Sequence, residues 1–234
     1  MNIYPKLKFE VNIELDIEMA FRFIDMNESG VNFGKRIVEL YPELKKAKIT
    51  NGNMRREIIT GFIKKHYLDN KTKIEDSLEQ MKKDWDTVEV IFFRSVNTIF
   101  GNMSWPKGDY ICYLSIFDCN PRFLENKTFQ VYFQHFQGTN HVIAHEMLHF
   151  AFFEYLKNHE PSLNERLDKH TIWLLSEWFN DLVLDLPEFE RFEHKVKTGY
   201  PEVVEFSKRF GDLGKEGFTI QKFLKHVKTI VQGV

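Results

Sequence analysis

A short apolar segment carries three groups that a protein interior does not accept without partners. Residues 142–151 read VIAHEMLHFA and are apolar except for His145, Glu146 and His149. A helix of this composition belongs inside a domain. Burying two imidazoles and a carboxylate there costs free energy unless a metal or hydrogen bonds satisfy them. The segment therefore requires a fold that supplies a partner for these three groups.

The spacing of the three groups indicates a metal as that partner. Residues four apart lie about one turn apart on the same face of a helix, so His145 and His149 can hold one zinc ion. Glu146 can reach a water bound to that metal and remove its proton. Met147 and Leu148 fall on the opposite, packed side. The alternative is a core helix with incidental histidines, which the chain's nine histidines allow.

A second apolar segment, LLSEWFNDLVL at 174–184, offers a third ligand. A catalytic zinc usually takes three protein ligands and leaves a fourth position for water. Glu177 would complete a set of two histidines and one carboxylate. Asp181, one turn later, would accept the other ring N–H of a ligating histidine. A solvated acidic face is the alternative, but apolar residues surround Glu177 almost completely.

HEMLH followed by SEWFND resembles the gluzincin clan of zinc metallopeptidases, whose signature is HExxH followed by ExxxD on a second helix. The resemblance implies zinc ligands at His145, His149 and Glu177, a general base at Glu146, and Asp181 as the carboxylate that supports His145. It also implies a zincin-like fold with two lobes. The match is limited to residues 145–181, and the segment between the two motifs is longer than in the clan's best-known member.

For both motifs to face one zinc ion, the two helices must form a balanced hairpin. The first helix is expected over about 141–158. A second helix that begins near Asp168, a good N-cap, places Glu177 at the matching depth. A start at the capping box that opens with Ser162 would carry Glu177 too far, by roughly 8–9 Å at 1.5 Å per residue. Residues 159–167 are therefore expected to connect the helices, with a short helical turn.

Composition sets the frame for this site. The 234 residues, 43% of them hydrophobic, can bury a substantial core, and we expect a single domain over 1–234. Within it, residues 1–140 would form helices and a sheet, and residues 141–234 a helical subdomain that begins with the zinc helix. A net charge of −2 gives no attraction to nucleic acid or to an anionic membrane.

The expected location is the cytoplasm. No apolar stretch reaches the roughly 20 residues of a membrane span. The N-terminal sequence MNIYPKLKFEV lacks the apolar run of a signal peptide. Cys112 and Cys119 would lie too far apart to bridge if the segment between them is extended. A reducing compartment fits this cysteine usage, and the sequence leaves the oligomeric state open.

The order of the predicted elements is that of a mostly helical α+β fold, with a small sheet before the HExxH helix and helices after it. Strict alternation predicts a half-buried strand over 7–15, and apolar steps of three or four predict a long helix over 73–100 that Gly101 stops. The other expected elements are several helices over 16–70 with breaks at 29–30, 41–42 and 51–52, strands at 110–117 and 128–136, and helices near 201–210 and from Thr219.

The two later strands bear on substrate binding. Residues 110–117 are apolar throughout, which predicts a central strand, whereas 128–136 alternate and could lie at an edge. In gluzincins an edge strand pairs with an extended substrate, a mode that recognises peptides by strand addition. The first candidate for that edge is 128–136, and the second is 110–117.

These observations predict a zinc metallopeptidase that acts on a peptide or protein substrate. A zinc hydrolase of a non-peptide amide and a non-catalytic, regulatory zinc protein are the alternatives. A tetrahedral intermediate would need a further donor, and the sequence favours none of its candidates, which are Tyr155, His170, His194 and Tyr200. His141 precedes His145 by one turn and is expected to be structural or to line the site, because one zinc cannot bind 141, 145 and 149 together.

Overall fold

A four-stranded mixed sheet forms the centre of the fold, and helices make up most of the rest. The computed structural model describes residues 4–101, 103–192, 200–211 and 213–231. The strand order is β1 (Leu7–Val11), β4 (Tyr110–Ser115), β6 (Thr128–Tyr132) and β5 (Arg122–Phe123). The first three run parallel, and β5 runs antiparallel to β6. The arrangement confirms the expected α+β class.

The first strand is shorter than its alternating sequence predicts. Strand β1 ends at Val11, and helix α1 (Ile13–Phe23) begins two residues later. The side chain of Asn12 accepts a hydrogen bond from the backbone N–H of Leu15 at 3.0 Å, which caps the new helix. The prediction of a strand over 7–15 is therefore wrong after Val11, because a local N-cap ends the alternation.

The position of the later strands confirms one prediction and corrects another. Strand β4 lies between β1 and β6, as its apolar sequence predicts. Strand β6 ends at Tyr132 rather than at residue 136, and it is not an edge strand. The segment that contains Pro121 folds back along it, so that β5 occupies the outer position. The Pro121 carbonyl accepts from the Gln130 N–H at 2.9 Å, and Asn120 Oδ1 accepts from the Tyr132 N–H at 2.8 Å.

Between β1 and β4 the chain is mostly helical, and the breaks between its helices lie where the sequence predicts them. Ser29 and Gly30, both at positive φ, form the turn between β2 (Asn27–Glu28) and β3 (Val31–Asn32). Gly101, at a φ of +69°, ends α5. The helices of this part are α1, α2 (Phe33–Leu40), the 3-10 helix η1 (Pro42–Leu44), α3 (Lys45–Lys48), α4 (Gly52–Asp69) and α5 (Lys71–Phe100).

After the sheet the chain is again helical. Its elements are α6 (Thr139–His159), α7 (Pro161–Arg166), α8 (Lys169–Leu184), the 3-10 helix η2 (Pro187–Phe192), α9 (Pro201–Ser207) and α10 (Ile220–Val231). Helix α9 is shorter than the helix expected near 201–210. Helix α10 buries the predicted apolar face, which includes Ile220, Phe223 and Val227. None of the helices in the described part of the chain is long and apolar enough to cross a membrane. Cys112 and Cys119 are both free and buried.

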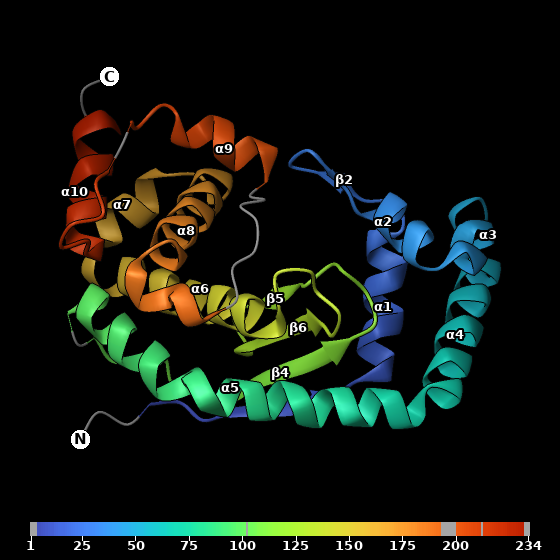
Figure 1. Cartoon of the computed structure of the whole chain (residues 1–234). Helices are drawn as coiled ribbons and strands as arrows, with labels where there is room; N and C mark the ends of the chain where they lie inside the picture. Colours follow the sequence, from blue (N-terminus) through green and yellow to red (C-terminus); the bar gives the residue numbers. More distant parts are fainter. Residues whose placement is uncertain (1–3, 102, 193–199, 212, 232–234) are drawn as a thin grey trace.

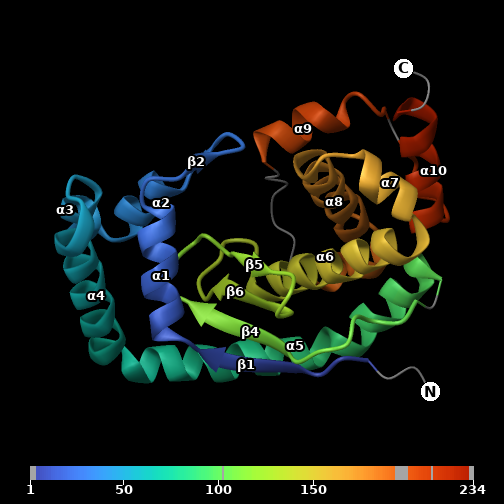
Figure 2. The same ribbon diagram turned by 180° about the vertical axis from the view of Figure 1, so that it is seen from behind.

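Two groups of helices lie toward opposite ends of the sheet. Helix α5 runs along the sheet, with α1–α4 toward one end and α7–α10 toward the other (Figures 1 and 2). The tip of the β2–β3 hairpin reaches across to the start of α9. Gly30 lies so close to Pro201 that a Cβ atom at position 30 would be 3.1 Å from the proline Cγ. The two groups of helices therefore touch at the hairpin tip.

A buried carboxylate joins the sheet to the N-terminal helices. Asp16 of α1 is fully buried and accepts hydrogen bonds from Tyr67 Oη, Ser115 Oγ and Gln130 Nε2, each at 2.6 Å. The backbone N–H of Ile116 donates to the same carboxylate at 3.2 Å. Burial raises the pKa of Asp16 from its usual range, and these four donors oppose the rise. The carboxylate thereby fixes α1 and α4 against β4 and β6.

We expect Asp16→Ala to lower the free energy of unfolding by about 3–5 kcal/mol, because four buried donors lose their acceptor. Urea denaturation measures the change. Asp109→Ala is the matched control: it removes an aspartate whose ion pair with Lys8 is largely exposed, and it should change stability little. Equal stability of the two variants would contradict a pinning role for Asp16.

Candidate metal centre

Helices α6 and α8 form the hairpin that the sequence predicts. Helix α8 begins after Asp168, whose Oδ1 accepts from the backbone N–H groups of His170 and Thr171 at 3.0 Å each. The short helix α7 lies in the connecting segment. Buried Asn180 of α8 donates from Nδ2 to the carbonyl oxygen of His145 at 2.9 Å. This bond fixes α8 next to the first histidine of the motif.

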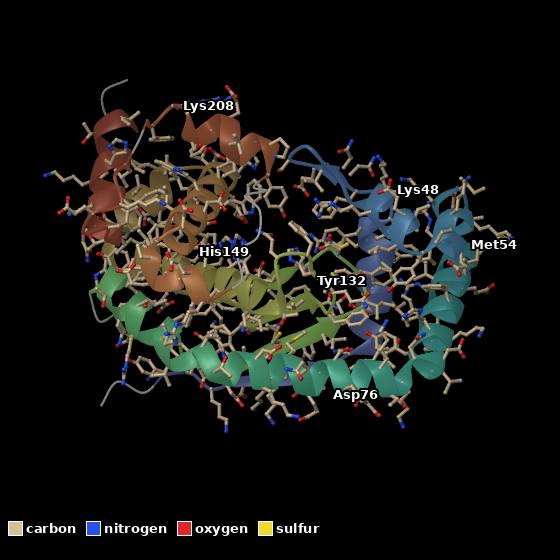
Figure 3. All side chains as sticks on the ribbon, in the orientation of Figure 1. Lys48, Met54, Asp76, Tyr132, His149 and Lys208 are labelled. Atoms are coloured by element: carbon tan, nitrogen blue, oxygen red, sulfur yellow. The ribbon has the colours of Figure 1, made fainter. Side chains whose placement is uncertain are left out.

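The hairpin brings His145, His149 and Glu177 to one point inside the molecule, where Figure 3 labels His149. The two Nε2 atoms are 3.0 Å apart. His145 Nε2 lies 3.0 Å from Glu177 Oε2, and His149 Nε2 lies 3.2 Å from Glu177 Oε1. The side chain of His149 is 0% exposed and that of Glu177 6%. These residues form the one group in the described part of the chain whose ligand atoms could hold a metal ion.

The three ligand atoms fit a tetrahedral zinc ion. Zinc binds imidazole nitrogen and carboxylate oxygen at about 2.0–2.2 Å, which places tetrahedral ligand atoms about 3.3 Å from one another. The observed separations of 3.0–3.2 Å are close to this value. Two imidazoles with one carboxylate also leave a fourth position for water or substrate, as catalytic zinc sites do.

The charges of the three groups are tightly linked. Burial would raise the pKa of Glu177, but the charges and hydrogen bonds of His149 and His145 hold it well below its usual range. Burial would lower the pKa of His145, but Glu177 outweighs this effect and raises it. Burial and Arg122 lower the pKa of His149 to about 3. The protonation states of the three groups are therefore coupled, and a metal ion that binds them would displace any proton from the two rings.

Glu146 lies next to this group as a second buried carboxylate, with 6% of its side chain exposed. Burial raises the pKa of Glu146, and the nearby charges of Arg122 and His145 offset part of the rise. A carboxylate whose pKa is raised accepts a proton more readily near neutral pH, which is what a general base requires. Glu146 thus lies beside the predicted ligands, and its role as a base stays a prediction.

Arg122 is a site residue that the sequence analysis missed. It comes from β5, its side chain is 13% exposed, and its Nη1 lies 2.8 Å from Glu146 Oε2. Its Nη2 lies 3.8 Å from Glu177 Oε1. No local pattern marks this arginine, because its contact with Glu146 depends on how the segment around Pro121 folds back along β6.

The other predicted residues have different surroundings. Asp181 is exposed, and its charge helps to raise the pKa of His145, but its bond to a histidine ring stays a prediction. Burial raises the pKa of Tyr200, and the charges of Glu177 and Glu146 add to the rise, so its hydroxyl stays protonated near the site. His194 lies outside the described residues.

Three further residues that the sequence analysis considered do not belong to the group of possible metal ligands. His170 is exposed and lies 2.6 Å from Glu202 Oε1. Tyr155 stacks on His159 with a centroid separation of 4.4 Å. His141 is buried, and its Nε2 lies 3.3 Å from Gln137 Nε2. These positions agree with the expectation that His141 is not a ligand.

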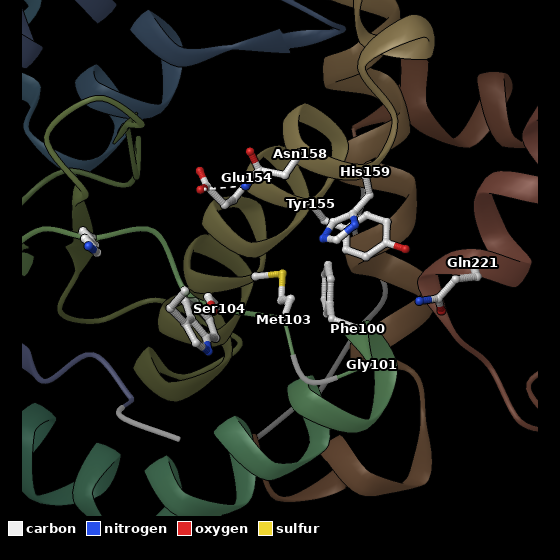
Figure 4. A pocket seen from close by; sticks show the side chains of 11 residues that line it. Phe100, Gly101, Met103, Ser104, Glu154, Tyr155, Asn158, His159 and Gln221 are labelled. Atoms are coloured by element: carbon white, nitrogen blue, oxygen red, sulfur yellow. Dashed lines mark hydrogen bonds between the residues drawn. The ribbon is translucent and has the colours of Figure 1, made fainter. Parts of the chain in front are cut away.

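A separate groove of about 770 Å³ lies at the other end of α6 (Figure 4). Its lining includes Phe100, Trp105, Tyr155 and His159. None of the three candidate ligands takes part in it. The groove is therefore distinct from the metal centre.

No family model matches the chain, and comparisons with curated proteins and with solved structures gave no match. The chemistry of the centre therefore has to be inferred from its own residues.

Zinc affinity should depend on pH through His145. A proton on this ring competes with the metal, so binding is strongest above the raised pKa of His145 and weakens as the pH falls below it, by up to about tenfold per pH unit. Competition with a coloured chelator from about pH 5.5 to 8 measures the effect. Glu177→Gln should weaken binding throughout and shift the loss to lower pH. An affinity independent of pH would contradict the ligand set.

Proposed function

We propose that this protein is a zinc-dependent metallopeptidase that hydrolyses peptide bonds. The observation that carries the proposal is the convergence of two imidazoles and one carboxylate, beside a second buried carboxylate of raised pKa. The HExxH and ExxxD motifs support it through their resemblance to the gluzincin clan. A sheet before the first helix of the hairpin and helices after the second also agree with the layout of that clan.

Each residue has a role in the proposed reaction. His145, His149 and Glu177 would hold zinc, a Lewis acid that polarises a substrate carbonyl and makes water acidic near neutral pH. Glu146 would take the proton from the attacking water and pass it to the leaving amine. Tyr200, whose pKa the charges of Glu177 and Glu146 help to raise, is a candidate to donate to the developing oxyanion.

The sheet supports a peptide as substrate. An extended chain binds to a sheet by adding a strand at an exposed edge. Strand β5 takes the edge position that was expected for 128–136, and its Arg122 contacts the proposed base. We therefore assign β5, rather than β4 or β6, as the strand along which the substrate lies.

A zinc ion with a purely structural role agrees less well with the same geometry. Structural zinc sites are usually closed by four protein ligands, mostly cysteine and histidine. The described group contains three ligands and no cysteine. A structural site also has no need of Glu146, whose burial beside the ligands costs free energy. Hydrolysis of a non-peptide amide would use the same groups, and substrate profiling separates it from peptide cleavage.

Glu146→Gln should keep its zinc and lose cleavage of a peptide library by roughly 100- to 10,000-fold, because an amide cannot accept the proton. Glu177→Ala should lose both zinc and cleavage. Metal analysis of the purified protein and fluorogenic peptide assays measure the two properties.

Glu154→Gln is the matched control, since Glu154 lies on the same helix but lines the separate groove. It should keep both zinc and activity. Cleavage by Glu146→Gln at the native rate would overturn the mechanism. A native protein that binds no zinc after chelation and replenishment would overturn the metal assignment.

A further inference from the structure

A partly buried cation, Arg122, faces the two carboxylates of the site. The guanidinium of Arg122 carries five N–H donors and stays charged at any pH that a protein tolerates. Glu146 and Glu177 lie 2.8 and 3.8 Å from its nitrogen atoms. With 13% of its side chain exposed, Arg122 depends on protein groups rather than on water for its partners.

The working site needs both of those carboxylates for other tasks, and this step rests on the proposed function. Glu177 would bind the metal, and Glu146 would turn toward the attacking water. A guanidinium that is mostly shielded from water loses free energy when its N–H groups lack an acceptor. The loaded enzyme therefore has a cation that lacks a full set of partners until another anion arrives.

The charge of the centre favours that anion. A zinc ion would contribute two positive charges and Arg122 one, against one negative charge from each of Glu146 and Glu177. Asp118, another acidic group in this region, already has His135 at 3.5 Å and Arg36 at 3.6 Å as partners. Asp181 also acts on His145, but it is exposed, so water weakens its effect. The innermost groups alone would carry one net positive charge, which a single carboxylate neutralises.

We propose that Arg122 is a substrate-binding residue that selects peptides with a carboxylate close to the scissile bond. Its place on β5, the proposed substrate strand, puts the guanidinium beside an extended chain and next to Glu146. An arginine fork binds a carboxylate through two parallel N–H···O bonds, which gives orientation as well as affinity. The carboxylate can be a free C-terminus or an acidic side chain, and one set of peptides distinguishes the two.

The first experiment uses the native, zinc-loaded protein and three fluorogenic peptides of otherwise identical sequence. One has a free C-terminus next to the scissile bond, one is amidated there, and one is amidated but carries glutamate at the neighbouring position. We expect one of the two carboxylate peptides to exceed the plain amide in kcat/KM by roughly 10- to 100-fold, as for a charge-assisted hydrogen bond. The better substrate identifies the source of the carboxylate.

The second experiment replaces the arginine. Arg122→Met should abolish the preference, and Arg122→Lys should restore part of it, since lysine keeps the charge but loses the fork. Arg36→Met is the matched control, because Arg36 is a nearby arginine that pairs with Asp118 instead of the site. It should keep the preference. Zinc content of each variant separates loss of substrate binding from loss of the metal.

A binding measurement tests Arg122 without turnover. Calorimetry compares N-acetylleucine with its amide on the zinc-loaded native protein and on Arg122→Met. The free acid should bind the native protein roughly 10-fold or more tightly than the amide does, and the difference should disappear in the variant. The calorimetric comparison stands even if no peptide in the set is cleaved.

Two outcomes would overturn the role of Arg122 while the proposed function stands: native cleavage of all three peptides at equal kcat/KM, or a preference that survives Arg122→Met. By contrast, absence of zinc and of all cleavage would remove the proposed function. Equal binding of acid and amide by the zinc-loaded native protein would remove the role of Arg122 even if no peptide is cleaved.

Discussion

The rest of the molecule depends on the placing of three polar groups between two apolar helices: His149 and Glu177, which are buried, and His145, which is partly exposed. Each group would lose free energy on leaving water if it stood alone. With the two Nε2 atoms 3.0 Å apart and each 3.0–3.2 Å from one Glu177 oxygen, they supply one another with partners, and the same atoms could hold a metal ion. This arrangement demands two helices of matched length, and the Asp168 cap and the Asn180 bond to the His145 carbonyl set that match. The metal centre and the helix pairing are thus one structural requirement.

The sheet determines which side chains lie next to the α6–α8 hairpin. Asp16 gathers four donors from neighbouring elements, so α1, β4 and β6 are held in a single arrangement. That arrangement in turn determines where the chain between β4 and β6 can run. The segment between β4 and β6 folds back as β5, which places Arg122 in contact with Glu146. A buried carboxylate in the first helix therefore contributes, through the sheet, to the polar environment of a second carboxylate in the site.

The sequence predicted those parts of the fold that local patterns control. The cap at Asp168 and the stop at Gly101 follow from residue preferences over a few positions, and both were predicted correctly. The strand end at Val11 was missed because apolar alternation continues through Ile13 while the Asn12 cap already turns the chain into a helix. The approach of His145 and His149 could be predicted because their spacing is helical, and that of Glu177 because the cap at Asp168 sets its depth in the α6–α8 hairpin. The contact of Arg122 could not, since its partners are set by the order of strands in the sheet and no short sequence window contains that information.

The contact between Gly30 and Pro201 joins the N-terminal group of helices to the C-terminal group. At this contact the tip of the β2–β3 hairpin meets the first turn of α9. Tyr200 is the residue before Pro201, and the charges of Glu177 and Glu146 help to raise its pKa. The Ser29 side chain also hydrogen-bonds to the Glu202 carboxylate, so a polar contact adds to the approach of Gly30 and Pro201. Because Tyr200 directly precedes Pro201, the position of the hairpin tip bears on where the Tyr200 side chain can lie relative to Glu146 and Glu177.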